Sequence, residues 1–166
     1  ATNIFIAAFT TAHARLKLYD ALDQLKESVL YYDTDSIIYV SNGTNDPPTG
    51  GYLGEFTDEL EGKYITTFVS GGAKNYAYTC SDGSRVTKAR GFTINSKTQE
   101  VLNFDTVKNF VTSYHEEEKS VLVPNTLFLR NSLLKTIETR DESKKYRVVY
   151  TKRVIQPDFN TLPYGY

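Results

Sequence analysis

The sequence contains no methionine, no tryptophan and only one cysteine, Cys80. A single thiol cannot form a disulfide within the chain, and the two histidines, His13 and His115, are too far apart in sequence for a zinc-ligand spacing. These absences exclude a disulfide-stapled miniprotein and a zinc module, and they make an intracellular, reducing compartment the expected location. Because the chain opens on Ala1 and has no Met, we expect it to be part of a longer protein.

The sequence also lacks any apolar run near the roughly 18 residues that a membrane span requires, and it shows no basic, apolar leader. Its 166 residues are 40% hydrophobic and 23% charged, which is typical of a soluble globular domain with its own core. We therefore expect no membrane partner.

The net charge of −1 hides an asymmetry along the chain. Residues 1–70 contain 4 Lys and Arg against 10 Asp and Glu, whereas residues 71–166 contain 15 against 10. A metal-dependent enzyme that acts on a polyanion needs such a division, because carboxylates hold cations and basic side chains neutralise phosphates. Solvated surface explains a shift of this size almost as well, so the asymmetry alone assigns no function.

Local patterns in the first part of the chain predict a helix and then a hairpin. Apolar residues recur at a period near 3.6 over residues 3–25, with Thr2 or Asn3 as the N-cap. Two β-rich runs follow, Ser28–Tyr32 and Ser36–Val40, and a three-residue connection separates them. Such a connection predicts a β-hairpin whose tip carries two aspartates.

The same signals predict the remaining elements, with a loop over residues 42–51. Strands are expected over Tyr64–Val69, Asn75–Cys80 and Val86–Phe92, a helix over Phe104–Tyr114, and four short strands over Ser120–Val123, Leu127–Leu129, Leu134–Thr139 and Lys144–Tyr150. The point most like a domain boundary lies near residues 95–103. The expected fold class is α+β, with a long helix packed on an antiparallel sheet and a small α/β subdomain after it.

The most informative segment is the hairpin connection, Asp33-Thr34-Asp35, inside Tyr31–Ser36. Two carboxylates two residues apart repel each other unless a cation compensates their charge. Mg²⁺ prefers oxygen ligands and retains waters for substrate phosphates, so one or two carboxylates at a strand end suit it. The alternative is an ordinary turn in which Asp side chains bond to the backbone.

A second motif, Lys74-Asn75-Tyr76, lies downstream of the hairpin. Alternate residues of a strand point to one face, which would place a cation for a phosphate beside an aromatic ring for a sugar or base. On the next expected strand, Lys88 and Arg90 share a face and would extend this track of phosphate contacts. Ordinary solvated strand residues remain the alternative for each.

Together, the helix, the Tyr-x-Asp-Thr-Asp-Ser hairpin and the Lys-x-Tyr segment resemble the C-terminal palm of family B DNA polymerases. The resemblance is closest to the protein-primed branch, which includes Polinton (Maverick) transposon polymerases and organellar and viral types. It extends over nearly the whole chain, through Leu53–Leu60, Phe68–Tyr78, Lys88–Phe92 and Pro163–Tyr166.

The resemblance implies a palm portion over residues 1–95 and a thumb-like subdomain over 96–166. It implies that Asp35 is a direct ligand of Mg²⁺ (or Mn²⁺), that Asp33 is a catalytic carboxylate beside it, and that Lys74 and Tyr76 contact the primer. The implied partners are primer–template DNA, deoxynucleoside triphosphates and the N-terminal domains of the polymerase. A eukaryotic transposon origin would imply a nuclear location.

Two departures from the family pattern leave alternatives open. Tyr32 stands where many members have a small residue, and the other palm aspartate, the fingers helix and the exonuclease are absent. The chain would thus hold half of a two-metal site and would be inactive alone, since nucleotidyl transfer needs carboxylates from two strands. The alternatives are a non-catalytic remnant that binds DNA or a polymerase partner, and another two-metal phosphotransferase.

Overall fold

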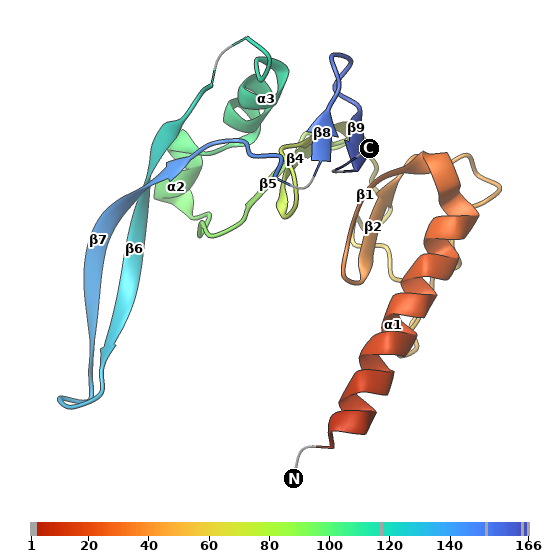
Figure 1. The fold of residues 1–166 in the computed structure, drawn as a ribbon, viewed down its shortest axis with the longest axis horizontal. Coiled ribbons are helices and arrows are strands. Elements are labelled where there is room, and N and C mark those ends of the chain that lie inside the picture. The colour runs from red at the N-terminus through yellow and green to blue at the C-terminus, as the bar shows by residue number, and fades with distance from the viewer. Residues whose placement is uncertain (1–2, 117, 152, 164, 166) are drawn as a thin grey trace. The chain divides into compact units, whose positions relative to one another are not determined.

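The computed structural model describes residues 3–116, 118–151, 153–163 and 165, and it has an α+β fold (Figure 1). Its helices are α1 (Ile4–Leu25), a short 3-10 turn (Lys26–Ser28), α2 (Ser96–Val101) and α3 (Phe104–Thr112). Its strands are β1 (Val29–Asp33), β2 (Ser36–Tyr39), β3 (Ile65–Ser70), β4 (Asn75–Cys80), β5 (Arg85–Ala89), β6 (Val121–Asn131), β7 (Thr136–Tyr146), β8 (Arg153–Ile155) and β9 (Thr161–Pro163). None of the helices in this described part is long and apolar enough to cross a membrane.

The chain forms two compact units, residues 1–62 and residues 63–166. The first contains α1 and the β1–β2 hairpin, and the second contains the three-stranded β3–β4–β5 sheet, α2, α3 and the β6–β7 and β8–β9 hairpins. All named strand pairs are antiparallel.

Helix α1 begins where the sequence predicts it. The side chain of Asn3 accepts hydrogen bonds from the backbone N–H groups of Phe5 (3.0 Å) and Ile6 (3.2 Å), which makes it the N-cap. The helix ends at Leu25 because Lys26 turns to a φ of +48°. The predicted helix is therefore confirmed, with Asn3 rather than Thr2 as its cap.

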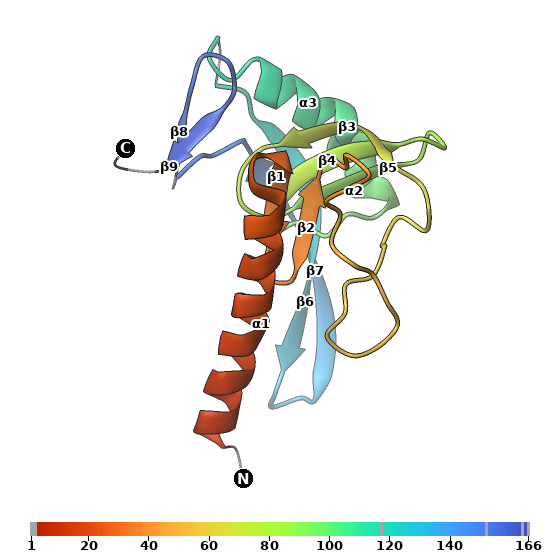
Figure 2. The same ribbon diagram turned by 90° about the vertical axis from the view of Figure 1, so that its right-hand side faces the viewer.

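Helix α1 packs on the β1–β2 hairpin through its C-terminal half. Its buried residues are Leu18, Ala21 and Leu25, all in its C-terminal half, which lies beside the hairpin in Figure 2. The 22-residue helix is about 33 Å long, whereas a five-residue strand covers only about 17 Å. The hairpin is therefore too short to cover the whole helix, and the N-terminal Ile4 and Phe5 are exposed.

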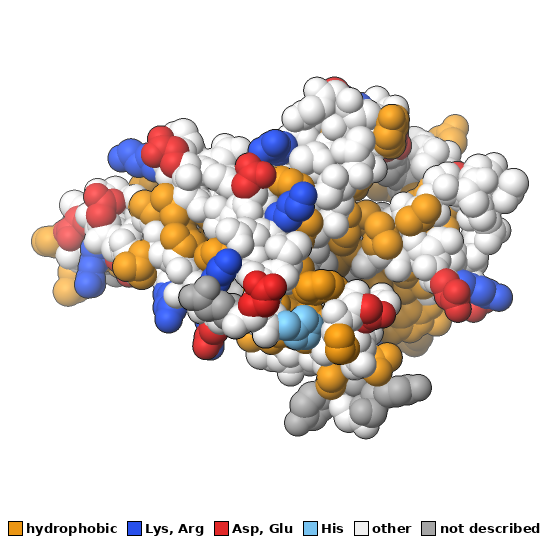
Figure 3. Space-filling model, turned by 90° about the horizontal axis from the view of Figure 1, so that it is seen from above, with side chains coloured by type: hydrophobic (Ala, Val, Ile, Leu, Met, Phe, Trp, Pro, Cys, Tyr) orange, Lys and Arg blue, Asp and Glu red, His pale blue; other side chains and the backbone are white. Residues whose placement is uncertain are grey.

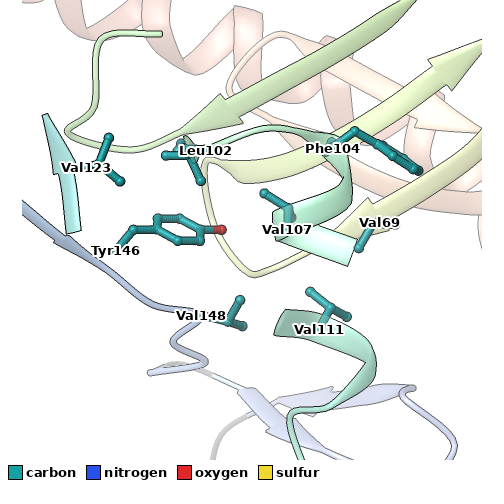
Figure 4. Packing of buried hydrophobic residues seen from close by; sticks show 10 residues of the cluster. Val69, Leu102, Phe104, Val107, Val111, Val123, Tyr146 and Val148 are labelled. Carbon is teal, nitrogen blue, oxygen red and sulfur yellow. The ribbon is translucent and has the colours of Figure 1, made fainter. Parts of the chain in front are cut away.

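The second unit is built around one hydrophobic core. Residues from the sheet, the two helices and the β6–β7 hairpin meet there, as Figure 4 shows for Leu102, Val107 and Tyr146. Helix α3 is capped by Asn103, whose side chain accepts a hydrogen bond from the N–H of Thr106 (3.1 Å). Its apolar side covers one face of the sheet. The buried members are Val69, Ala77, Ala89, Leu102, Phe104, Val107, Val111, Val123, Tyr146 and Val148.

One hydrophobic core extends across the domain boundary expected near residues 95–103. Val69, Ala77 and Ala89 precede that region and Phe104 and Val107 follow it, yet all belong to one core. The region itself contains α2, whose cap is Asn95. The division between compact units lies between residues 62 and 63 instead. The assignment of residues 1–95 and 96–166 to polymerase subdomains stays a prediction.

The C-terminal strands differ from the expected set. In place of four short strands, β6 and β7 form one antiparallel ribbon of eleven residues per strand, paired from Val121↔Tyr146 to Asn131↔Thr136. Pro124 lies within β6, because both strands of a two-stranded ribbon are edge strands, where a residue without an N–H is tolerated. Beyond Tyr146 the chain leaves the ribbon, so the predicted strand to Tyr150 ends early.

Candidate functional site

The β1–β2 hairpin brings the two aspartates together at its tip. Asp33 is the last residue of β1 and pairs with Ser36, so the connection is a two-residue turn of Thr34 and Asp35 rather than the three residues expected. The hydroxyl of Ser36 donates to the backbone oxygen of Asp33 (3.1 Å), and the N–H of Asp35 donates to the same oxygen (2.5 Å). Asp33 is half-buried and Asp35 is exposed.

Backbone strain is present between the two aspartates. Thr34 adopts a φ of +53°, which is disfavoured for a β-branched side chain. Its hydroxyl donates to the carboxylate of Asp33 (3.0 Å). Glycine or asparagine would fit this position with less strain. Strain of this kind costs on the order of 1–3 kcal/mol. Lys26, Glu61 and Lys135 also adopt positive φ, so it is the pair of aspartates, together with the strain, that makes this turn a candidate site.

The donor set at this tip fits part of a divalent-cation site. Carboxylate oxygens are the ligands that Mg²⁺ and Mn²⁺ prefer, and Mg²⁺ is commonly held by one or two carboxylates together with substrate phosphates. Among the residues that the structure describes, no group of three or more His, Cys, Asp or Glu side chains gathers into a metal-binding cluster. Asp33 and Asp35 therefore fit such a cation in kind, and other oxygens must complete its shell.

The second predicted motif is centred on β4, but Lys74 does not lie in that strand. Strand β4 begins at Asn75, and Lys74 occupies the preceding turn with a φ of +57°. The turn is closed because the N–H of Asn75 donates to the oxygen of Gly72 (3.1 Å) and the N–H of Gly71 donates to the oxygen of Asn75 (2.8 Å). The expectation that Lys74 and Tyr76 alternate along one strand is therefore wrong.

Tyr76 instead lies opposite another predicted residue. On β4 and β5, Tyr76 pairs directly with Lys88. Because neighbouring strand residues point to opposite faces, this pair lies on the face away from Ala77 and the core. The structure thus brings Tyr76 and Lys88 together, as the sequence could not show.

Aromatic rings extend this face. The ring of Tyr76 stacks on that of Tyr78 with centroids 6.3 Å apart and an interplanar angle of 11°, and the ring of Phe68 lies 6.0 Å from Tyr76. Lys88 is exposed beside this row of three rings. Aromatic rings and a cation on one sheet face are the elements with which proteins bind nucleic-acid strands.

Arg90 is a further correction. Strand β5 ends at Ala89, and Arg90 lies in the turn that follows, so it does not share a strand face with Lys88 as predicted. The glycine after it adopts a φ of +82°, which ends the strand there. Arg90 is exposed in that turn.

Charges of both signs are mixed on the surface of the second unit. Arg85 forms an ion pair with Asp105 (2.7 Å), and Arg147 forms one with Glu118 (2.8 Å). On the face seen in Figure 3, basic and acidic side chains are interspersed rather than gathered by sign. The basic surplus counted along the sequence is therefore partly paired, and any phosphate binding there depends on a few particular side chains.

The buried Tyr146 and the half-buried Tyr150 both contact the region of the Lys-x-Tyr motif, and no local sequence pattern predicts these contacts. The hydroxyl of Tyr146 donates to the side-chain oxygen of Asn75 (2.8 Å), and that of Tyr150 donates to the backbone oxygen of Ser70 (2.9 Å). Burial raises the pKa of each tyrosine to about 12, so both hydroxyls keep their protons at neutral pH. These contacts join residues 71 and 80 positions apart, and no local pattern links residues at such separations.

The predicted residues thus fall into two groups within the described part of the chain. Asp33 and Asp35 meet in the first unit, whereas Lys74, Tyr76, Lys88 and Arg90 belong to the second. In the closing segment, residues 163–166, Tyr164 and Tyr166 lie outside the described residues. Comparison with known proteins finds no matching family model, no matching curated protein and no matching solved structure.

Proposed function

We propose that this chain is the C-terminal palm and thumb portion of a DNA-directed DNA polymerase that catalyses two-metal nucleotidyl transfer to a primer 3′ end. The observation that carries the proposal is the hairpin turn with Asp33 and Asp35 at its tip and a strained Thr34 between them. An ordinary solvent-exposed turn has no need of a β-branched residue at positive φ between two like charges.

In this proposal Asp33 and Asp35 hold Mg²⁺ or Mn²⁺, which neutralises developing charge on the transferring phosphoryl group when bound. Both carboxylates stand on a paired hairpin, which fixes their backbone positions before substrate arrives. Tyr76 and Lys88 contact the primer strand through a ring and a cation, with Lys74 and Arg90 as further phosphate contacts. The N-terminal polymerase domains supply the missing palm aspartate and bind the deoxynucleoside triphosphate.

A non-catalytic DNA-binding remnant is the second candidate. It is favoured by the core of residues 63–166, which supports the Tyr76–Lys88 face without the aspartate hairpin. Both candidates place the chain inside a cell, in a reducing compartment, and in the nucleus if its source is a eukaryotic transposon. They differ in whether the hairpin binds a catalytic cation.

Mn²⁺ titration tests the cation site directly. We expect binding at the hairpin tip with a dissociation constant weaker than about 10⁻⁴ M, because two carboxylates supply too few ligands and no triphosphate completes the shell. Paramagnetic broadening of backbone amide signals should centre on Thr34 and Asp35. The broadening should disappear in Asp35→Asn. Broadening centred elsewhere, or sub-micromolar affinity at the tip, would contradict a half-site.

DNA binding by the chain tests the sheet face. We expect Lys88→Gln to lower the slope of log K against log salt by about 0.9, because one phosphate contact is lost. Tyr76→Ala should weaken binding to primer–template DNA by about 1–3 kcal/mol and leave the slope unchanged, since it removes a stacking surface and no charge. Fluorescence anisotropy over a salt series measures both.

The matched control is Lys108→Gln. Lys108 is an exposed lysine on α3, the helix that covers the opposite face of the same sheet. Its replacement removes one positive charge from the same unit and should leave the slope unaltered. Equal effects of Lys88→Gln and Lys108→Gln would show that only overall charge matters, and the proposed interface would then be rejected.

A further inference from the structure

Asn75, the middle residue of the Lys-x-Tyr motif, is a buried hub. Its side-chain N–H₂ donates to the backbone oxygen of Gly71 (3.1 Å), and its side-chain oxygen accepts from the hydroxyl of Tyr146 (2.8 Å). Only 9% of Asn75 is exposed. An amide at that depth that lost a partner would cost about 1–3 kcal/mol, so both bonds hold it in one orientation.

The turn before Asn75 is packed tightly against the segment that follows β7. A Cβ atom at Gly71 would lie 2.7 Å from the side-chain nitrogen of Asn75 and 3.3 Å from Val148. At Gly72, where φ is +111°, it would lie 2.9 Å from the backbone oxygen of Val149. Only glycine fits at either position without a shift of its neighbours, so residues 146–150 form a wall against this turn.

Lys74 sits at the end of this turn in a conformation that lysine does not favour. Its φ of +57° lies in the left-handed region, and the N–H of Asn75 closes the turn by donating to Gly72 (3.1 Å). The backbone conformation of Lys74 therefore depends on the position of Asn75, whose N–H closes the turn. Tyr146, 71 positions downstream, helps to fix Asn75 through the hydrogen bond from its hydroxyl to the Asn75 side chain.

We propose that Tyr146 is a positioning residue for DNA binding, which acts through Asn75 to fix the turn that presents Lys74 to a backbone phosphate of the primer. This proposal rests on the proposed function, because it needs the Lys74 contact with DNA. It assigns to the thumb-like end of the chain a defined effect on a motif in the sheet. The ring of Tyr146 does not touch DNA.

The variant that tests this is Tyr146→Phe. It keeps the ring, which packs at 5.6 Å from Phe92 and 5.9 Å from Phe110, and it removes only the hydroxyl. We expect the slope of log K against log salt to fall by about 0.9, the effect of losing one phosphate contact. If the two affinities are equal at 1 M salt, this change weakens primer–template binding about eightfold at 0.1 M salt. Hydrogen exchange at the amide of Asn75 should accelerate.

Two further variants separate positioning from loss of stability. In a Lys74→Gln background, Tyr146→Phe should cause no further change in affinity or slope, because the contact it positions is already gone. Val123→Ala changes an apolar side chain of the same core, which makes no side-chain hydrogen bond to Asn75, and it should lower stability and leave the slope intact. A hydroxyl with a merely structural role would instead reduce affinity equally in both backgrounds.

The outcomes also distinguish the positioning role of Tyr146 from the proposed DNA-binding function on which it rests. If Lys74→Gln changes the slope and Tyr146→Phe does not, the positioning role is wrong and the DNA interface stands. If Lys74→Gln leaves the slope unchanged, Lys74 does not contact a phosphate. The positioning role of Tyr146 is then wrong, and the proposed function loses Lys74 as a phosphate contact. If Tyr146→Phe changes neither the slope nor hydrogen exchange at the amide of Asn75, the Tyr146 hydroxyl does not hold Asn75 in place, and the proposal is overturned.

Discussion

On the proposed function, Asp35→Asn in a full-length polymerase containing this chain is expected to reduce template-directed primer extension at least about 10²–10³-fold. The asparagine preserves the size of the side chain and the two-residue turn, but it removes the charge that a divalent cation requires. Losing one hydrogen-bond donor that stabilises a developing charge costs about that much in other enzymes. A carboxylate that holds a catalytic cation should matter at least as much, because the cation stabilises the transferring phosphoryl group. The measurement is steady-state nucleotide incorporation on a defined primer–template.

The control for this experiment is Asp23→Asn. Asp23 is an exposed aspartate on α1 in the same compact unit, so its replacement changes the net charge equally. Extension by that variant should stay within a factor of two of the parent, on the order expected for a remote surface change. The 166-residue chain alone should incorporate no nucleotide. Full activity of Asp35→Asn, or incorporation by the chain alone, would refute the assignment of a half-site to this hairpin.

Local signals predicted the elements whose residues interact with near neighbours in the chain. The helix α1, the hairpin and strands β3 and β4 follow from periodicity and β-rich composition within short windows. Asn3 could be predicted as an N-cap because capping acts over only three residues. Within the candidate site, the same locality allowed Asp33 and Asp35 to be placed at one tip.

The features that sequence could not supply depend on positive φ angles or on distant partners. Neither Thr34 nor Lys74 is a residue that marks left-handed backbone, so the two-residue turn and the position of Lys74 outside β4 were missed. The Tyr76–Lys88 pair depends on the register between β4 and β5. The turn between these two strands sets that register, and it lies outside the Lys-x-Tyr motif. Tyr146 was one of 13 tyrosines with nothing local to distinguish it.

The largest expected loss of stability comes from Leu102→Ala. Leu102 has no exposed surface and lies between α2 and α3, where its N–H donates to Thr98 (2.7 Å). Removing its side chain leaves a cavity in a close-packed core and should lower the free energy of unfolding by about 2–5 kcal/mol. Chemical denaturation followed by far-ultraviolet circular dichroism gives that value. Leu133→Ala, at an exposed ribbon turn, should change it by less than about 0.5 kcal/mol.

The same variant tests whether the sheet and α3 fold as one body. Because Ala77 on β4 and Val107 on α3 belong to the core that Leu102 completes, protection of their amides against hydrogen exchange should fall together. Amides of α1, which belongs to the other compact unit, should keep their protection. If α3 lost protection while β4 kept it, the chain would divide near residue 95 after all. Joint loss means instead that α3 and the β3–β4–β5 sheet share one core, and the proposed positioning of Asn75 by Tyr146 requires that rigidity.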